Sequence, residues 1–399
     1  MTAQEQTGRG IGPEYLLAGR YRLRSKIGDG GMGAVWLARD TLLSRDVAVK
    51  QVTSTEGLDT ETAEEVRERT LREGRNAAKL THPHSIAMYD VAIESGEPWL
   101  VMEYFPARSL AQAMNLADTL PPLEVAQIGA QIAAALTEAH AAGIVHRDIK
   151  PGNILIADRG KSLGTVKISD FGIARAKSDV SDTQDEVITG TPAYFAPEVA
   201  RGDDPTEASD VFSLGSTLYT VIEGQPPFGI DSDAIALLHR VAKAEIYRPT
   251  KSGPLTDVLL QLLEPDPTRR PTMAQARDAL AAAATGGGTI DQLIDAPVYS
   301  SEGAVPAWAH RTTQLADPHR RNRLTGSTVT GLPAVQQNTP LRNVPSPMDM
   351  FSWPPRMPTG PADASTRDKV VAWAPLAMTG MVAVIVLAAL IVVILVFTA

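Results

Sequence analysis

A glycine-rich turn between two predicted strands limits what the first part of this chain can fold into. Strand-forming residues occupy 21–26 and resume at 34–38, which together predict a β-hairpin. The turn carries the spacing Gly28-x-Gly30-x-x-Gly33, and glycines let a backbone approach phosphate groups closely. Dinucleotide-binding folds use a similar spacing, but there the glycines lead from a strand into a helix. Because these glycines lead into a second strand, the sequence favours a flap over nucleotide phosphates.

Lys50 lies on a predicted third strand, 46–52, which is rich in valine and alanine. A lysine in an apolar strand needs a counter-charge, because burial of an unpaired ammonium is costly. The charged helix predicted over 60–80 offers several glutamates. We expect Glu73 to be the partner, because among these glutamates it alone precedes Ala77 and Leu80 at a spacing that fits the end of the helix. Alternatively, all the acids of this helix could form a solvated face.

A second cluster of polar residues lies in segment 144–153. A proline and a glycine in this segment exclude a regular helix, so the side chains of Asp148, Lys150 and Asn153 can converge. Asp148 could accept a proton from a substrate hydroxyl, Lys150 could neutralise a transferring phosphoryl group, and Asn153 could hold a metal. Taken alone, such a segment is more often a solvated turn than a catalytic loop.

Asp170 follows a short hairpin predicted from the apolar runs 153–156 and 166–169. A carboxylate placed there can join Asn153, and carboxylate, amide and phosphate oxygens are the ligands that Mg²⁺ prefers. The sequence therefore predicts a magnesium site. Farther along the chain, Glu198 and Arg270 are expected to form a buried ion pair that braces the segment ending at Glu198.

The arrangement of predicted elements indicates an α+β fold with two lobes. Residues 21–104 form a small, sheet-rich lobe after a flexible segment, 1–20. Residues 105–284 form a mainly helical lobe, with helices predicted over 124–142, 210–223 and 272–284 from their apolar periodicity.

The charge and the cysteine content restrict the class of partner and the compartment. A net charge of −9 and a pI near 5.4 argue against nucleic acid as a partner, because phosphate backbones are bound by clustered Lys and Arg. The chain has no cysteine, which excludes disulfides and thiolate metal sites and fits a cytoplasmic working part.

The composition changes sharply after residue 284. Residues 285–368 are rich in Pro, Ser and Thr without periodicity, as expected of a disordered juxtamembrane linker. Residues 370–398 carry no charge, and the aliphatic run 376–397 would span roughly 33 Å as a helix, against a hydrocarbon core of about 30 Å. We expect a single transmembrane helix, with the preceding chain in the cytoplasm and virtually nothing outside. A buried core helix is the alternative.

The order of these motifs, from Gly28 to Arg270, resembles the eukaryotic-like protein kinases. The details look closest to the bacterial transmembrane serine/threonine kinases, notably Gly30-Gly31-Met32-Gly33, Leu37-Ala38-Arg39-Asp40 and Asp210-Val211-Phe212-Ser213-Leu214-Gly215. The resemblance implies a two-lobed kinase fold that transfers the γ-phosphoryl group of ATP to protein Ser or Thr hydroxyls, with Mg²⁺ or in its place Mn²⁺.

The resemblance also implies a role for each matching residue. Asp148 would be the catalytic base, Lys150 would steady the γ-phosphate, and Asn153 with Asp170 would coordinate magnesium. Lys50, held by Glu73, would bind the α- and β-phosphates, and Glu103 and Phe105 would offer backbone hydrogen bonds to adenine. The nucleotide would be enclosed by Ile27, Gly28, Gly30, Gly33, Val35, Ala48, Met102 and Leu155. Asp210, Glu198 and Arg270 would be structural.

Regulation is expected to depend on Arg147. With Arg175 it would form a basic pocket that is satisfied when the loop over 172–198 is phosphorylated. Thr183 is the preferred acceptor and Thr189 the second. Thr191 should hydrogen-bond near Asp148 and help to select the hydroxyl. Where related kinases often carry a second threonine, this chain has Asp185, followed by Glu186, which could partly replace a phosphate.

Other interpretations remain open at this point. A pseudokinase could bind nucleotide or partners without turnover, and a tethered docking scaffold could use its linker rather than its kinase fold. A membrane helix could bring kinase domains together as a dimer, although plain anchoring is the simpler expectation. Phosphorylated linker residues could bind phosphopeptide-binding partners.

Overall fold

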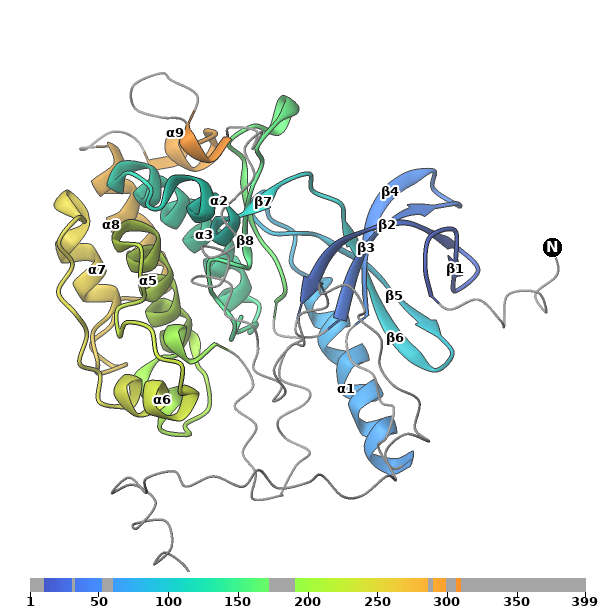
Figure 1. Ribbon diagram of the computed structural model, residues 1–399, viewed down its shortest axis with the longest axis horizontal. Helices are drawn as coiled ribbons and strands as arrows, with labels where there is room; N and C mark the ends of the chain where they lie inside the picture. The colour runs from blue at the N-terminus through green and yellow to red at the C-terminus, as the bar shows by residue number, and fades with distance from the viewer. Residues whose placement is uncertain are drawn as a thin grey trace, which may run out of the picture. The chain divides into compact units, whose positions relative to one another are not determined.

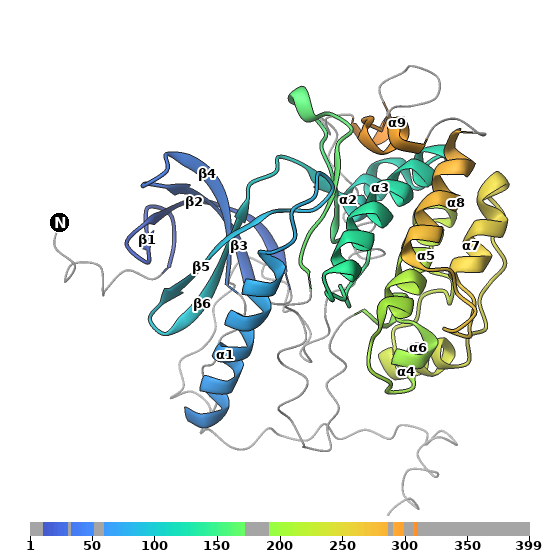
Figure 2. The ribbon, with the colours of Figure 1, turned by 180° about the vertical axis from the view of Figure 1, so that it is seen from behind.

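The computed structural model describes residues 11–30, 33–51, 60–171, 191–285, 290–298 and 306–309. A sheet with one long helix makes up the first part of the described chain, and helices dominate the second part (Figure 1). The view from behind shows the same division, with α1 beside the sheet and α3, α5 and α8 grouped together (Figure 2).

The first part is a six-stranded antiparallel sheet with the order β1-β2-β3-β4-β6-β5. Its strands are β1 (Leu16–Leu17), β2 (Tyr21–Gly30), β3 (Gly33–Asp40), β4 (Arg45–Gln51), β5 (Met88–Glu94) and β6 (Glu97–Glu103). The predicted hairpin and third strand are present as β2, β3 and β4. Strands β1 and β5 were not predicted. Strand β1 has only two residues, and β5 mixes polar and apolar residues.

The hairpin of β2 and β3 places the glycine-rich turn beside the end of β4. Gly30 pairs with Gly33, and Val35 lies opposite Lys50 on β4. Gly33 has φ +132°, and a Cβ there would lie 2.7 Å from the carbonyl oxygen of Gln51. Only glycine fits such an approach, so the turn is held against the strand that carries Lys50. Gly31 and Met32 lie outside the described residues.

Helix α1 (Thr60–Ala77) packs on β5 and β6. Its contact with the sheet depends on Gly74, because a Cβ there would lie 2.8 Å from Cγ2 of Val91. The helix ends three residues before the predicted end at Leu80, but Leu80 is buried in the core of the helical part.

The helical part is built around α3 (Pro122–Ala141), which is buried along most of its length and packs on α5 and α8. The other helices are α2 (Leu110–Ala117), α4 (Pro197–Ala200), α5 (Glu207–Glu223), α6 (Ala234–Ala242), α7 (Thr256–Leu262) and α8 (Met273–Thr285). Short 3₁₀ helices occupy Gly160–Ser162, Pro192–Tyr194, Gly253–Leu255 and Ala307–Ala309. Helix α5 starts earlier than predicted because Thr206 and Ser209 form a capping box.

A small sheet joins the two parts. It consists of β7 (Arg108–Ser109), β8 (Ile154–Ile156) and β9 (Val166–Ile168) in the order β7-β8-β9. The predicted hairpin that leads to Asp170 is therefore confirmed as β8 and β9. Ile154, Ile156, Val166 and Ile168 are all fully buried in the helical core, which fixes the position of the chain on either side of the hairpin.

The prediction of disorder over the whole of 285–368 is wrong for part of that range. Helix α9 (Ile290–Asp295) packs on α3 and α8, and Val298 and Trp308 are buried in the same core as α3. Trp308 is only 1% exposed. The helical lobe therefore extends past its predicted end at residue 284.

The predicted transmembrane helix at 370–398, and the linker beyond residue 309, lie outside the described residues. Within the part of the chain that the structure describes, no helix has the length and apolar character needed to cross a membrane.

Candidate active site

Asp148, Lys150 and Asn153 converge as the sequence predicts. Lys150 Nζ lies 3.0 Å from Asp148 Oδ1 and 2.8 Å from Oδ2. The Asn153 amide nitrogen donates to Asp148 Oδ2 and to the carbonyl oxygen of Asp148, both at 2.8 Å. One carboxylate is thus oriented by an ammonium and an amide, and since Asn153 is buried, its amide position is well defined.

Asp210 holds the backbone of this loop. Its buried carboxylate accepts the backbone N–H of His146 at 2.7 Å and of Arg147 at 2.9 Å, and His140 Nε2 lies 2.9 Å away. Arg147 has φ +67°, a conformation that costs a non-glycine residue about 1 kcal/mol. The two hydrogen bonds that the loop donates to Asp210 on α5 offset this strain and fix the position of Asp148. His140 was not anticipated, because nothing in the sequence marks a histidine within an alanine-rich helix as a partner for a distant aspartate.

The loop is joined to the segment that carries Asp170. His146 is fully buried, its Nε2 lies 3.0 Å from the carbonyl oxygen of Ser169, and its ring centroid is 4.6 Å from that of Phe171. Ser169 N donates to the carbonyl oxygen of Asn153 at 2.9 Å. These contacts bring the segments of Asn153 and Asp170 together, as the hairpin predicts.

Lys50 contacts Asp170 across this region. The distance from Lys50 Nζ to Asp170 Oδ1 is 2.5 Å, and Lys50 is only 9% exposed. Burial on its own would raise the pKa of Asp170, but the charge and the hydrogen bond of Lys50 outweigh it, so the pKa is lowered. Asp170 is therefore a carboxylate at neutral pH.

The prediction that Glu73 holds Lys50 is wrong for this structure. Among the described residues, the ion pair of Lys50 is with Asp170, and Glu73 Oε1 instead lies 3.9 Å from Nη1 of Arg147. Glu73 does face the site, as its position on α1 predicts. Its partner depends on how α1 is placed against the rest of the fold, which is a tertiary property that the helix sequence does not encode.

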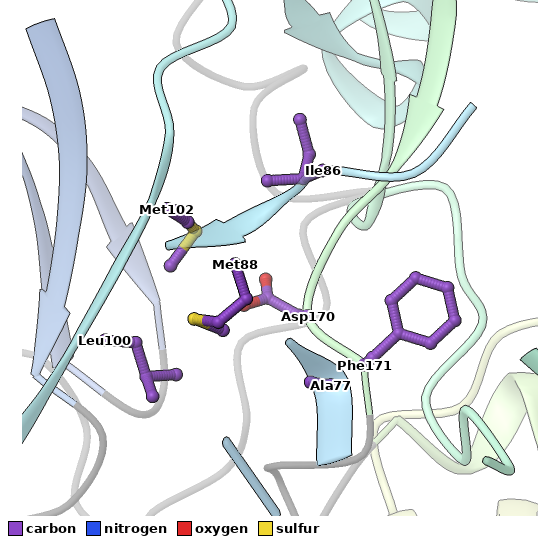
Figure 3. A pocket seen from close by; sticks show the side chains of 7 residues that line it. All are labelled: Ala77, Ile86, Met88, Leu100, Met102, Asp170 and Phe171. Atoms are coloured by element: carbon purple, nitrogen blue, oxygen red, sulfur yellow. The ribbon is translucent and has the colours of Figure 1, made fainter. Parts of the chain in front are cut away.

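A pocket lies between α1, the sheet and the start of the 171–191 region. It is lined by Ala77, Ile86, Met88, Leu100, Met102, Asp170 and Phe171 (Figure 3). Two of the predicted adenine neighbours, Val35 and Ala48, belong to the same apolar cluster as Met102. Leu155 is half-buried on β8, and Ile27 is 45% exposed on β2. The structure therefore brings together Val35, Ala48 and Met102, and it does not place Ile27 or Leu155 in that cluster.

The connection after β6 is tied to β9 by Lys167, which sequence reasoning missed. Lys167 Nζ donates to Glu103 Oε2 at 3.0 Å and to the carbonyl oxygen of Ser85 at 3.1 Å, and it lies 5.7 Å from the Phe105 ring centroid. Glu103 N donates to the carbonyl oxygen of Ala87 at 2.9 Å, so Glu103 cannot offer its N–H to adenine. The available signal in the sequence was a lysine between two β-branched residues, Val166 and Ile168, which predicts that its side chain lies on the opposite face of the strand from theirs.

The donors present fit a magnesium ion held together with phosphate. Among the residues that the structure describes, no three His, Cys, Asp or Glu side chains form a group able to hold a metal. One carboxylate from Asp170 and one amide oxygen from Asn153 are instead on offer. Mg²⁺ is commonly bound by one or two carboxylates with the remaining ligands from substrate phosphates and water. The donor set therefore suits a metal that arrives with a nucleotide.

The predicted ion pair of Glu198 and Arg270 is confirmed. Arg270 Nη1 and Nη2 lie 2.6 and 2.7 Å from the two carboxylate oxygens, and both side chains are nearly fully buried. Burial raises the pKa of Glu198, but the hydrogen bonds and charge of Arg270, together with hydrogen bonds from the backbone and Ser209, lower it overall. Thr191 and Asp148 are both described, and the hydrogen bond predicted near Asp148 is not formed between them. Arg175, Thr183 and Thr189 lie in 172–190, outside the described residues.

The protein kinase domain family matches residues 21–280 of this chain. A serine/threonine-protein kinase named PrkC, from Bacillus subtilis, is 36% identical over 267 residues, which are 66% of this chain and 40% of the relative. PknB of Mycobacterium leprae is 38% identical, with 64% and 41% covered, and PknB of Mycolicibacterium smegmatis is 36% identical, with 77% and 48% covered.

This chain thus covers less than half of the length of these relatives. The family match nevertheless spans both the sheet and the helical part, including every segment that contributes Lys50, Asp148, Asn153 and Asp170. On these grounds the chain belongs to the protein kinase domain family.

Proposed function

We propose that the chain is a serine/threonine protein kinase. The observation that carries the proposal is the convergence of Asp148, Lys150 and Asn153 on one loop, joined to Asp170 and Lys50. Asp148 accepts the proton of a substrate hydroxyl as its oxygen bonds to the γ-phosphorus. The bond between that phosphorus and the β–γ bridging oxygen breaks, and ADP leaves. The relatives named above, which are called serine/threonine-protein kinases, support the choice of acceptor.

The other residues of the site bind and orient the nucleotide. Lys50 holds the α- and β-phosphates beneath the turn of Gly28, Gly30 and Gly33, and Lys150 neutralises charge on the transferring group. Asn153 and Asp170 hold magnesium, which supplies positive charge to the phosphate oxygens when bound. Val35, Ala48 and Met102 enclose the base. Mn²⁺ could take the same oxygen donors.

Phosphoamino-acid analysis tests the acceptor. The full chain, incubated with Mg-ATP and a mixed protein substrate, is expected to produce phosphoserine and phosphothreonine without phosphotyrosine. Phosphotyrosine as the main product would contradict the proposal. Nucleotide binding without any transfer would favour the alternative, a pseudokinase or a tethered docking scaffold.

In our proposal, the two ion pairs of the site belong to the kinase before it is activated. Lys50 is bonded to Asp170, and Glu73 lies against Arg147. Bringing a phosphate to Arg147 would give that guanidinium a stronger partner than Glu73, since charge-assisted bonds from Arg to phosphate are bidentate and short. Glu73 would then lose its contact with Arg147 and could pair with Lys50, which would leave Asp170 to magnesium. We infer that phosphorylation of the 172–190 region activates the kinase through this exchange.

Replacing Thr183 by alanine is expected to lower the single-turnover rate at least severalfold, because Arg147 would keep its contact with Glu73. Thr189→Ala is the matched control and should have the smaller effect. The measurement compares both variants after preincubation with Mg-ATP. An unchanged rate in Thr183→Ala would exclude this residue as the activating site and leave Thr189 as the acceptor, or Asp185 and Glu186 as fixed substitutes.

Attachment to the cell membrane through residues 370–398 is a further proposal, supported by the uncharged, aliphatic sequence of that segment. The kinase domain would lie in the cytoplasm. The full chain should sediment with membranes and resist an alkaline wash, whereas a variant without 370–398 should remain in the supernatant. Sedimentation of both forms would show that another part of the chain holds the bilayer. The anchored form could pair as a dimer, and its phosphorylated linker could recruit phosphopeptide-binding proteins.

A further inference from the structure

The end of α9 is captured by amide donors from α3. Gln131, which is fully buried, directs Nε2 to the carbonyl oxygens of Ile294 at 3.0 Å and Ala296 at 2.6 Å. Gln127 Nε2 also donates to Ala296 at 3.0 Å. The last carbonyls of a helix have no partner within the helix itself. Two glutamines on α3 donate to these carbonyl oxygens, so the end of α9 is bound at a specific position on the helical part.

The chain after α9 fits a glycine in the β8–β9 connection. Val298 N donates to the carbonyl oxygen of Gly164 at 2.8 Å. Gly164 has φ +79°, and a Cβ there would lie 2.5 Å from the carbonyl oxygen and 2.9 Å from the nitrogen of Val298. A side chain at this position would exclude the segment.

Trp308 is a second anchoring residue of the chain that follows α9. The short helix that carries it lies against α2, its side chain is 1% exposed, and its Nε1 donates to Glu124 Oε2 at 3.2 Å. Burial of Glu124 raises the pKa of that carboxyl, and the hydrogen bond from Trp308 partly counteracts the effect. Burial of such a large aromatic side chain strengthens the docking of this part of the chain. We define the described residues 290–298 and 306–309 as the C-terminal clasp.

His84 connects the clasp to the strand that leads to Asp170. Its Nε2 lies 2.8 Å from the carbonyl oxygen of Ile294, and its Nδ1 lies 2.7 Å from that of Val166 on β9. Both partners are backbone carbonyl oxygens, so His84 lies between one acceptor on the clasp and one on β9.

The charged and titratable groups around this ring come from four elements. His82 lies on the same loop with its ring centroid 5.7 Å away, and burial together with the charge of His84 lowers the pKa of His82. Lys167 on β9, Glu138 on α3 and Asp295 on α9 also act on His82. The two acids raise the pKa of His82, and Lys167 lowers it.

The loop of His84 is itself bonded to β9. Ile168 N donates to the carbonyl oxygen of His84, and Ile86 N donates to that of Ile168, both at 2.9 Å. Ile168 is two residues before Asp170, and the same loop follows α1, which carries Glu73. An unbroken series of hydrogen bonds therefore runs from the clasp, through His84, to the segment that holds Asp170.

We propose that the C-terminal clasp is a positioning element of the active site, and that His84 transmits its docking to Asp170. When the clasp is docked, His84 fixes the loop after α1 against β9. When it leaves, one nitrogen of His84 loses its carbonyl and the loop is held by β9 alone. The catalytic consequence rests on the proposed kinase function, whereas the coupling itself is measured without ATP.

A pair of glycine substitutions tests the coupling. Gly164→Ala introduces a methyl group that collides with Val298, whereas Gly160→Ala, in the same connection with φ +71°, places its methyl group in open space. Both variants carry similar backbone strain, so only their effects on docking differ. Hydrogen exchange of the full chain is measured by mass spectrometry in wild type and both variants.

In Gly164→Ala, exchange should rise about tenfold or more in peptides covering 290–298 and also in those covering 82–88, as expected when local opening becomes easier. Peptides of α5 should not change, and Gly160→Ala should match wild type. Faster exchange in 290–298 with none in 82–88 would overturn the coupling. Equal effects in both variants, or none in either, would overturn the docking. Gln127→Ala provides a milder second variant if Gly164→Ala does not fold.

Two further measurements separate positioning from plain stability. With a peptide substrate, Gly164→Ala should lower kcat severalfold with the peptide KM unchanged, and Gly160→Ala should not. If exchange changes as expected but no variant shows kinase activity, the coupling stands and the proposed function fails. His84→Phe keeps an aromatic ring but contacts neither carbonyl oxygen through a nitrogen, so it should accelerate exchange in both 82–88 and 290–298. Unchanged exchange of 290–298 in this variant would overturn the role of His84.

Discussion

Replacing Asp148 by asparagine is expected to reduce phosphoryl transfer by about 10² to 10⁴-fold, the usual contribution of a positioned general base. Asparagine preserves the size of the side chain but cannot accept the proton of the substrate hydroxyl. Lys150 and Asn153 would still find an oxygen at the same place, so nucleotide affinity should change little. Phosphate incorporation into a protein substrate by the full chain, under single-turnover conditions, measures the effect.

Asp257→Asn is a suitable control, because it makes the same chemical change at an exposed position on α7. It should leave the rate within a factor of about two, as surface substitutions usually do. If Asp148→Asn and Asp257→Asn transfer phosphate equally fast, Asp148 is not the base, and the loop described above has another purpose.

Replacing Arg270 by methionine is expected to lower the free energy of unfolding by about 3–5 kcal/mol, the usual cost of leaving one member of a buried ion pair without its partner. Arg270 also donates to the backbone carbonyls of Glu264, Ala208 and Pro265. Methionine fills much of the same volume but donates to none of them. Urea denaturation, followed by tryptophan fluorescence, measures the loss.

The neighbouring Arg269→Met is the matched control, since that side chain is 70% exposed and should cost less than about 1 kcal/mol. The pH dependence gives a second check. Because the pKa of Glu198 is lowered in the folded state, the stability that the pair contributes is present above the unfolded pKa and is lost as pH falls through the folded pKa. The deficit of Arg270→Met should therefore shrink in acid. A deficit that is small at neutral pH, or grows in acid, would contradict this account.

The parts of the site that lie close together in the sequence were predictable, and those that depend on packing were not. Asp148, Lys150 and Asn153 share one irregular segment, and a short hairpin joins Asn153 to Asp170, so local geometry was sufficient. The partner of Lys50 was not predictable in this way. Glu73 and Asp170 are both within reach of such a lysine, and the choice between them depends on the placement of α1 against the sheet.

The C-terminal clasp was missed for a different reason. Ile290, Leu293, Ile294 and Val298 recur at helical spacing, but this short signal was hidden when the composition was averaged over the whole of 285–368. The burial of Val298 and Trp308 depends on Gln127, Gln131 and Gly164, which are far away in the sequence and unremarkable there. Average composition predicts a tether over this range and does not detect two anchoring side chains within it.

The pocket beside Asp170 has a consequence for selective inhibition. Its walls come from α1, the sheet and Phe171, so its shape depends on the relative placement of three elements, and the two methionines that line it can adapt to different shapes (Figure 3). A ligand shifts a conformational equilibrium only by its differential affinity for the two states. A compound that bound beside Asp170 only while Lys50 is bonded to that carboxylate would favour this arrangement. Such a compound would discriminate between conformations of the enzyme, and it would not need to imitate a nucleotide.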